Sequence, residues 1–273
     1  MAVIAISQQL GSRGIELGQL AAQELGWRFL NGQEIVAETA HRYGVSEDEL
    51  LVFDLRTPHF WQRLRSESHR YLAYFRAVLL KELAQDSIVV AGRTLAHQTP
   101  HLRCALRARV VAPVSVRVNQ LMEEEKISHS VAEKHVREHD REIRERSQTL
   151  SGVDVEDPTL YDLIVNSFTH PLESTATLLA NAGRKIENAS NPMDHTAMRD
   201  AATAALVHAA LLAHPKIRDA QISVACKAGA VQLNGPGLVA PWDELVSEVA
   251  RGIEGVSAVE VAVEEPAMPM RTD

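Results

Sequence analysis

Apolar residues gather in short runs along the first two thirds of the chain. Each run is rich in Val and Ile, and the segments between the runs carry an apolar residue every three to four positions, as a surface helix does. The runs predict strands at 3–7, 87–91, 106–112 and 160–166. The segments between and after them predict helices at 14–25, 32–41, 59–84, 114–125, 130–148 and 171–182. Continuous apolar strands that alternate with helices predict an α/β fold, in which helices cover both faces of a parallel sheet.

The pattern changes after residue 182. Residues 183–196 are polar, include a proline and show no periodicity, which is typical of a linker. Alternating strands are expected next at 217–226, 230–233 and 258–263, with helices at 197–213 and 241–253. This order predicts a small α+β domain. We therefore divide the chain into a large domain (1–186), a linker (187–196), a small domain (197–266) and a tail (267–273).

Composition narrows the classes of function. The chain has 273 residues, of which 45% are hydrophobic and 23% charged, as in an ordinary soluble globular protein. Its net charge of −8 argues against a nucleic-acid partner. The longest apolar run, 201–213, is too short to cross a bilayer, and the chain starts directly with a core strand. We expect a cytoplasmic protein without a membrane partner, in which Cys104 and Cys226 are buried, unreactive thiols.

A glycine turn between the first strand and the first helix is the strongest chemical signal. Such a turn places backbone N–H groups and the positive end of a helix dipole at the carboxyl end of a strand, where a phosphate can bind. We expect Gly11, Ser12, Arg13, Gly14 and Ile15 to form this cradle. In a complete P-loop, a lysine and a Ser or Thr would stand at the positions of Gly14 and Ile15. On this motif alone, a simple strand–turn–helix without a ligand is an equal alternative.

Further motifs follow in order over residues 1–182. They are Ile6-Ser7, Gly11-Ser12, Gly14, Glu16, Gly26-Trp27-Arg28-Phe29, Val89-Val90-Ala91-Gly92-Arg93, Arg109-Val110-Val111-Ala112-Pro113, Val116-Arg117, Asp140-Arg141, Gly152, Asp157-Pro158 and Tyr161-Asp162-Leu163-Ile164-Val165-Asn166. Together they resemble the cytidylate kinase-like family of P-loop nucleoside monophosphate kinases, which also lacks the usual P-loop lysine. The resemblance implies a P-loop kinase fold, ATP and Mg²⁺ as cofactors, and a nucleoside monophosphate such as CMP as acceptor.

The resemblance also implies roles for charged residues. Arg93 would contact the acceptor's phosphate, and Asp140 is expected to bind the substrate. Arg141 and Arg144 would belong to a lid that closes over the transferring group. Apart from the resemblance, Arg13 is expected to supply positive charge at the turn in place of the missing lysine. No metal-binding side chain is expected. The H-x-x-E-H pattern at 135–139 lies in a highly charged segment, so we interpret it as a solvated helix face.

Three positions depart from the family pattern. Gln8 stands where family members usually carry Arg, and Arg13 stands where they carry Gly. In the lid, Ile143 takes the second basic position, and Arg144 follows one residue later. A shift of one residue turns a side chain by about 100° around a helix. These departures leave two hypotheses open: an active kinase-like phosphotransferase, or a catalytically weak or inactive nucleotide sensor.

Motifs in the C-terminal part resemble a BON domain. They are Ala209-Ala210-Leu211, His214-Pro215-Lys216-Ile217, Ile222-Ser223-Val224, Gly229-Ala230-Val231-Gln232-Leu233-Asn234-Gly235 and Ile253-Glu254-Gly255-Val256-Ser257-Ala258-Val259. The resemblance implies binding of phospholipid or of a partner. Asp and Glu outnumber Lys and Arg in this part, so anionic lipid would be repelled. We expect contact with a protein partner or a regulatory role, and a stabilising appendage is the alternative.

Overall fold

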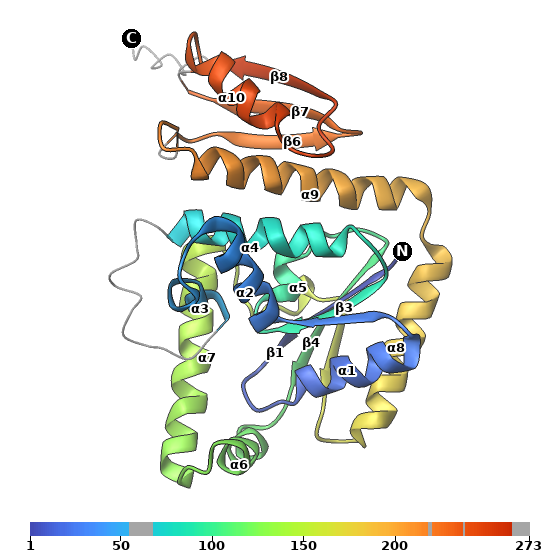
Figure 1. Ribbon diagram of the computed structural model, residues 1–273. Coiled ribbons are helices and arrows are strands. Elements are labelled where there is room, and N and C mark those ends of the chain that lie inside the picture. Colours follow the sequence, from blue (N-terminus) through green and yellow to red (C-terminus); the bar gives the residue numbers. More distant parts are fainter. Residues whose placement is uncertain (55–67, 218–219, 237, 264–273) are drawn as a thin grey trace, which may run out of the picture.

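A five-stranded parallel sheet forms the centre of the α/β part (Figure 1). The computed structural model describes residues 1–54, 68–217, 220–236 and 238–263. The strands of this sheet are β1 (Val3–Gln8), β2 (Arg28–Asn31), β3 (Ile88–Gly92), β4 (Ala105–Val111) and β5 (Leu163–Asn166). Their spatial order is β2-β3-β1-β4-β5, so β1 lies in the middle. The predicted α/β fold with a parallel sheet is confirmed.

Helices cover both faces of this sheet, which explains why its central strands are almost wholly apolar. The helices are α1 (Gly14–Leu25), α2 (Gly32–Tyr43), α3 (Glu47–Asp54), α4 (Ser68–Leu83), α5 (Leu95–Gln98), α6 (Val114–Glu125), α7 (His129–Ser151) and α8 (Leu172–Ala189), with a 3-10 turn at Pro158–Leu160. On one face, Leu17 of α1 and Leu179 of α8 pack against Ile4 and Ile6. On the other face, the core includes Phe75 of α4.

A second, three-stranded sheet forms the C-terminal part. The C-terminal part consists of the helices α9 (Pro192–Ala213) and α10 (Trp242–Arg251) and the strands β6 (Ser223–Lys227), β7 (Ala230–Gly235) and β8 (Ala258–Val263). Strand β7 pairs antiparallel with β6 and parallel with β8. Figure 1 shows α9 lying between α4 and this sheet. Met198 and Ala202 of α9 belong to the α4 core, whereas Val207 and Leu211 belong to the core of the small sheet.

The segment expected to be irregular, 183–196, is helical except for Ser190 and Asn191. Helix α8 continues to Ala189, and α9 begins at Pro192. The Asn191 side chain accepts hydrogen bonds from the N–H groups of Met193 and Asp194, and the Asp194 carboxylate accepts one from the Asn191 N–H. Polar residues and a proline are therefore the start signal of a helix here. The linker prediction was wrong in its secondary structure, and the division into domains stays a prediction.

Other elements differ from their predicted bounds. Strand β2 and helix α3 were not predicted. Strand β2 leaves no apolar run in the sequence, because it has only four residues and none of them is fully buried. The strand predicted at 217–226 is shorter and begins at Ser223. Of the helix predicted at 59–84, residues 59–67 lie outside the described part of the chain. Cys104 is buried as predicted and Cys226 is half-buried; burial raises the pKa of both thiols, that of Cys226 to about 11.

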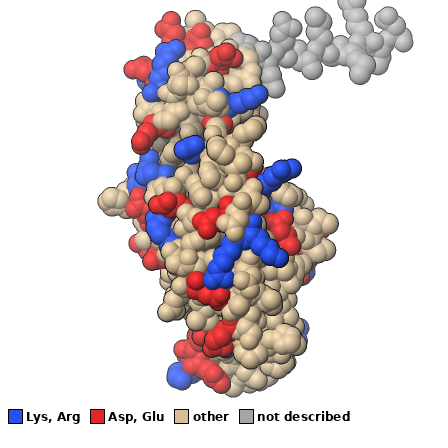
Figure 2. All heavy atoms as spheres, turned by 90° about the vertical axis from the view of Figure 1, so that its right-hand side faces the viewer, with Lys and Arg blue, Asp and Glu red and all other residues tan. Residues whose placement is uncertain are grey.

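Charged side chains of both signs are interspersed on the face shown in Figure 2. Within the described ranges, no helix has the length and the apolar character needed to span a bilayer. The cytoplasmic location stays a prediction.

Candidate functional site

The loop between β1 and α1 lies at the carboxyl edge of the central sheet. Two of its residues, Gly11 (φ +76°) and Arg13 (φ +58°), have left-handed backbone conformations. A Cβ atom on Gly11 would lie 2.5 Å from the carbonyl oxygen of Arg117, so only glycine lets the loop approach α6 this closely. Arg13 adopts the same conformation with a side chain, at a cost of about 1–2 kcal/mol. The loop is therefore held against α6 in one shape.

Backbone N–H groups at the start of α1 form an anion cradle. Within the part of the chain that the structure describes, the N–H groups of Arg13, Gly14 and Glu16 have no hydrogen-bond partner. The Ser12 N–H is bonded to the Gln9 carbonyl oxygen at 3.1 Å. Unpaired N–H groups at the positive end of a helix bind phosphate oxygens. The geometry thus fits a phosphate group at the predicted turn.

The Gln8 side chain folds back over this cradle. Its Oε1 atom accepts a hydrogen bond from the Ile15 N–H at 2.9 Å. A Cβ atom on Gly14 would lie 2.6 Å from the Gln8 Cβ and 2.7 Å from the Gln8 Oε1, so the missing side chain at Gly14 makes room for the amide. A neutral amide oxygen therefore occupies one of the donors that an anionic oxygen would use.

Ser12, which was predicted to bind phosphate, faces the interior. Its hydroxyl donates to the carbonyl oxygens of Gln9 at 2.7 Å and Val110 at 3.2 Å, and the residue is buried. The Ser167 hydroxyl, beyond β5, donates to the Ser12 carbonyl oxygen at 2.7 Å. Ser12 thus fixes the shape of the loop, and neither its hydroxyl nor its N–H is open to a ligand.

The Arg13 guanidinium is paired with Glu16 on the same helix. The Nε–Oε2 and Nη2–Oε1 distances are both 2.7 Å, and both side chains are about half exposed. The hydrogen bond from Arg13 lowers the pKa of Glu16 and raises the pKa of Arg13. The charge of Arg13 is therefore balanced by Glu16 in this structure, and its predicted role at the cradle stays a prediction.

The Asp140 carboxylate, which is predicted to bind substrate, forms an ion pair with Arg117 in this structure. The Nη1–Oδ1 distance is 2.9 Å and the Nη2–Oδ2 distance is 2.7 Å. Arg117 is 2% exposed, and its guanidinium also donates to the carbonyl oxygens of Ala112 at 3.1 Å and Leu10 at 3.4 Å. Sequence reasoning gave Arg117 no role of its own. The pair joins α7 to α6 and to the phosphate loop.

The arginines of α7 lie on different faces of that helix. Arg141 and Arg144, the predicted lid residues, are exposed, and Arg141 lies 4.0 Å from Glu145. Arg146 is buried and pairs with Glu142 at 3.2 Å. Burial lowers the pKa of Arg146. Arg146 is therefore the inward-facing arginine of α7. It lies on a buried stripe of positions 136, 139, 143, 146 and 147, and this helical spacing of three to four residues is the signal that the sequence offers for it.

Two more buried arginines lie near the carboxyl edge of the sheet. Arg93 directly follows β3, whose last residue, Gly92, pairs with Ser7 at the end of β1. Arg109 of β4 pairs with Ser7 from the other side, and its guanidinium donates to Tyr161 Oη at 2.9 Å and to Glu156 Oε1 at 2.6 Å. The structure thus places Arg93 at the same edge as the phosphate loop.

No side chain of the loop is suited to bind a magnesium ion. Ile15 stands where a Ser or Thr hydroxyl would coordinate the ion, and the Ser12 hydroxyl faces the interior. Among the residues that the structure describes, no group of three or more His, Cys, Asp or Glu side chains could hold a metal ion. The loop fits phosphate but not Mg²⁺.

Known proteins with similar sequences are cytidylate kinases. The cytidylate kinase of Thermoplasma acidophilum is 27% identical over 183 residues, which cover 65% of this chain and 90% of that protein. The cytidylate kinase of Pyrococcus horikoshii is 26% identical over 165 residues, which cover 60% of this chain and 79% of that protein.

A solved structure shares the fold. It is an uncharacterized protein from Eubacterium ventriosum, with a TM-score of 0.53 and 14% identity, and the match covers 67% of this chain and 98% of that one. A family model also matches the α/β part, which contains the parallel sheet and the phosphate loop. Residues 3–169 match the cytidylate kinase-like family, and the chain belongs to that family.

Proposed function

We propose that this protein is a nucleoside monophosphate kinase-like phosphotransferase, which moves the γ-phosphoryl group of ATP to a nucleoside monophosphate such as CMP. The observation that carries the proposal is the cradle at the start of α1, where the N–H groups of Arg13, Gly14 and Glu16 are open. Family membership supports the same reaction class. A nucleoside triphosphate presents its phosphates to such a cradle.

The proposed reaction is a transfer between two phosphate oxygens. An oxygen of the acceptor's phosphate forms a bond to the γ-phosphorus, and the bond from that phosphorus to the bridging oxygen breaks, so that ADP leaves with the electron pair. Side chains supply position and charge rather than covalent chemistry. Arg13 would stabilise the donor's charge after release from Glu16, and Arg93 would orient the acceptor's phosphate.

The lid assignment has two candidates on α7. Arg141 and Arg144 are exposed, so the helix would have to turn for them to reach the transferring group. Arg146 is buried and lines a small pocket together with Thr94, the residue that follows Arg93. We therefore rank Arg146 beside the two residues that the family pattern suggests. Kinases of this class use Mg²⁺ with ATP, and we assign no side chain of the loop to that ion.

A second candidate function rests on a specific contact. The Gln8 amide covers the Ile15 N–H, and Glu16 balances the charge of Arg13. Both contacts lower the capacity of the loop to stabilise a transferring phosphoryl group. We propose as the alternative a nucleotide sensor with little or no turnover, which signals through the C-terminal part as a BON-like domain.

Two measurements on the full chain separate these functions. The first is equilibrium binding of ATP with Mg²⁺, and the second is steady-state formation of ADP with ATP and each nucleoside monophosphate in turn. ADP formation that depends on an acceptor supports the kinase. Binding without acceptor-dependent turnover supports the sensor. If ATP does not bind, both proposals fail.

A further inference from the structure

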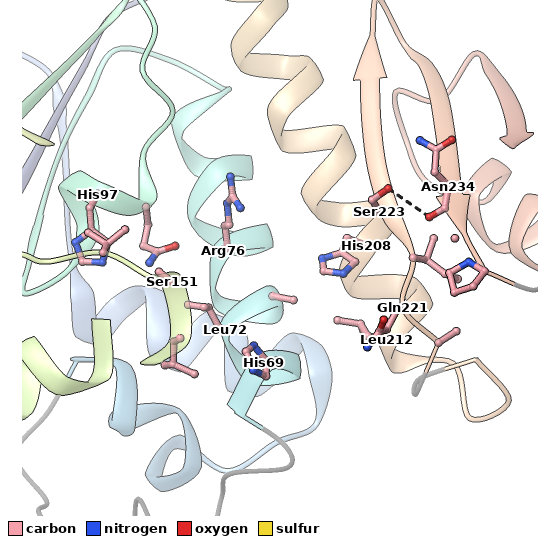
Figure 3. Close-up of a pocket in the computed structure, with 18 residues that line it drawn as sticks. His69, Leu72, Arg76, His97, Ser151, His208, Leu212, Gln221, Ser223 and Asn234 are labelled. Atoms are coloured by element: carbon pink, nitrogen blue, oxygen red, sulfur yellow. Dashed lines mark hydrogen bonds between the residues drawn. The ribbon is translucent and has the colours of Figure 1, made fainter. Parts of the chain in front are cut away.

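A cavity of about 830 Å³ lies between the α/β part and the C-terminal part (Figure 3). Its walls come from α4, α5, the end of α7, α9 and the strands β6 and β7. No residue of the phosphate loop lines it. Its volume is that of a site for a small organic molecule. The cavity is therefore separate from the nucleotide site proposed above.

Among the residues described around this cavity, Arg76 is the one charged side chain, and three histidines accompany it. Arg76 and His69 line it from α4, His97 from α5 and His208 from α9, and no Asp or Glu belongs to the described lining. Figure 3 shows His208 extending from α9 into the space between α9 and α4. Because the chain as a whole has a net charge of −8, a lining without acidic residues differs from its average surface. The cavity is suited to a negatively charged group.

The imidazoles can respond to an anion. Burial and the nearby charge of Arg76 lower the pKa of His208, and burial and Arg109 lower the pKa of His97 to about 4. The His97 Nδ1 atom is buried and has no hydrogen-bond partner among the described residues. A negative charge within reach would favour the protonated form of each ring and raise its pKa. An anion bound here would therefore gain hydrogen-bond donors from rings that are neutral without it.

The rest of the lining is apolar or neutral. Leu72, Leu150, Val153 and Leu212 provide apolar walls, while hydroxyl groups come from Ser151 and Ser223. Such a mixture binds a molecule that has both an apolar ring and a charged group. We propose that this cavity binds a small organic anion, in which a phosphate or carboxylate faces Arg76 and His208 and a ring faces the leucines.

Binding there would join the two parts of the chain. One wall, α5, follows Arg93 within the sequence, and the opposite wall, α9, carries the three-stranded sheet. A ligand in contact with both walls would favour this packing of the parts over any other. The proposed site is thus regulatory, and it does not depend on the proposed kinase activity.

The test uses small probes of known chemistry on the full chain. Phenyl phosphate, benzoate and phenol are titrated in turn, and binding is followed by ligand-observed NMR. Phenyl phosphate or benzoate is expected to bind at least tenfold more tightly than phenol, and the tighter of the two shows which anion the site prefers. Equal affinity for all three probes would overturn the proposal.

Variants locate the site. Arg76→Glu and, separately, His208→Glu are expected to weaken binding of the anionic probe at least tenfold. Lys227→Glu, which makes the same charge change at an exposed site on β6 outside the cavity, is expected to leave it unchanged. Arg13→Glu is expected to remove only phenyl phosphate binding at the phosphate loop and to retain the binding that depends on Arg76 and His208. Loss of binding in Arg13→Glu alone, or retention in both cavity variants, would contradict the assignment.

Discussion

Arg117 and Asp140 form a bidentate ion pair, with N–O distances of 2.9 and 2.7 Å, that joins α7 to the base of the phosphate loop. The same guanidinium reaches the Leu10 carbonyl oxygen, one residue before Gly11. In this structure α7 and the loop therefore share one buried anchor. Asp140 is committed to that anchor, so a substrate could reach its carboxylate only after the pair opens.

Removing one partner of this anchor should destabilise the fold. Asp140→Asn leaves the Arg117 charge buried without its counter-charge, and we expect a loss of about 2 kcal/mol in the free energy of unfolding. Urea unfolding measures it. Glu145→Gln, at an exposed pair with Arg141 on the same helix, is the control and should change nothing measurable. Equal stabilities for Asp140→Asn and the control would show that the pair is not an anchor.

Gln8 should weaken nucleotide binding. Gln8→Ala opens the Ile15 N–H to a phosphate oxygen, and we expect ATP to bind about threefold to tenfold more tightly. Gln8→Glu places a negative charge in the cradle, and we expect it to weaken ATP binding by about the same factor or more. Isothermal titration with ATP measures both variants, and Gln23→Ala on the exposed face of α1 is the control. Weaker binding by Gln8→Ala would mean that the amide supports the ligand instead of competing with it.

Helix α9 should stabilise the α/β part directly. Met198 is 0% exposed and belongs to the core that includes α4, whereas Met193, five residues earlier on the same helix, is 81% exposed. We expect Met198→Ala to cost about 2–5 kcal/mol of unfolding free energy. Met193→Ala should leave the unfolding midpoint unchanged. If the two variants unfold alike, α9 is an appendage and not part of the core.

Stability should fall in mild acid because of His97. Its pKa is about 4 in the folded chain and 6.5 when exposed, so the unfolded chain binds the proton more tightly. The contribution of this residue is present above pH 6.5 and is lost as the pH falls toward 4, which amounts to about 2 kcal/mol at pH 5. Unfolding of wild type and His97→Gln at pH 7.5 and pH 5 isolates this contribution. The same pH dependence in both proteins would contradict the assignment to His97.

The pattern of apolar positions was sufficient for four of the five strands of the central sheet and for most helices. Strands β1, β3 and β4 are buried on both faces, and such strands leave an unbroken apolar run in the sequence. Strand β2 leaves none, since it is short and half exposed. The capping box at Asn191 was mistaken for a linker because caps and loops use the same polar residues.

The phosphate loop could be placed from sequence, but its contacts could not. Gly11, Gly14 and the following helix predict a cradle, whereas the occupation of the Ile15 N–H by Gln8 depends on a side-chain conformation. The pairing of Arg117 with Asp140 spans 23 positions in the chain and joins two helices, so no local pattern encodes it. Likewise, the cavity between the two parts exists only in the packed structure.

Phosphoryl transfer from a donor at the Gly11–Ile15 loop can be followed directly with a labelled nucleotide. ATP labelled at the γ-phosphate is incubated with Mg²⁺, the full chain and CMP or another nucleoside monophosphate, and the products are separated. We predict labelled nucleoside diphosphate from the wild-type chain and from Lys227→Glu, and at least tenfold less of it from Arg13→Glu. If the chain binds ATP but yields no labelled nucleoside diphosphate with any acceptor, the proposed phosphoryl transfer is contradicted.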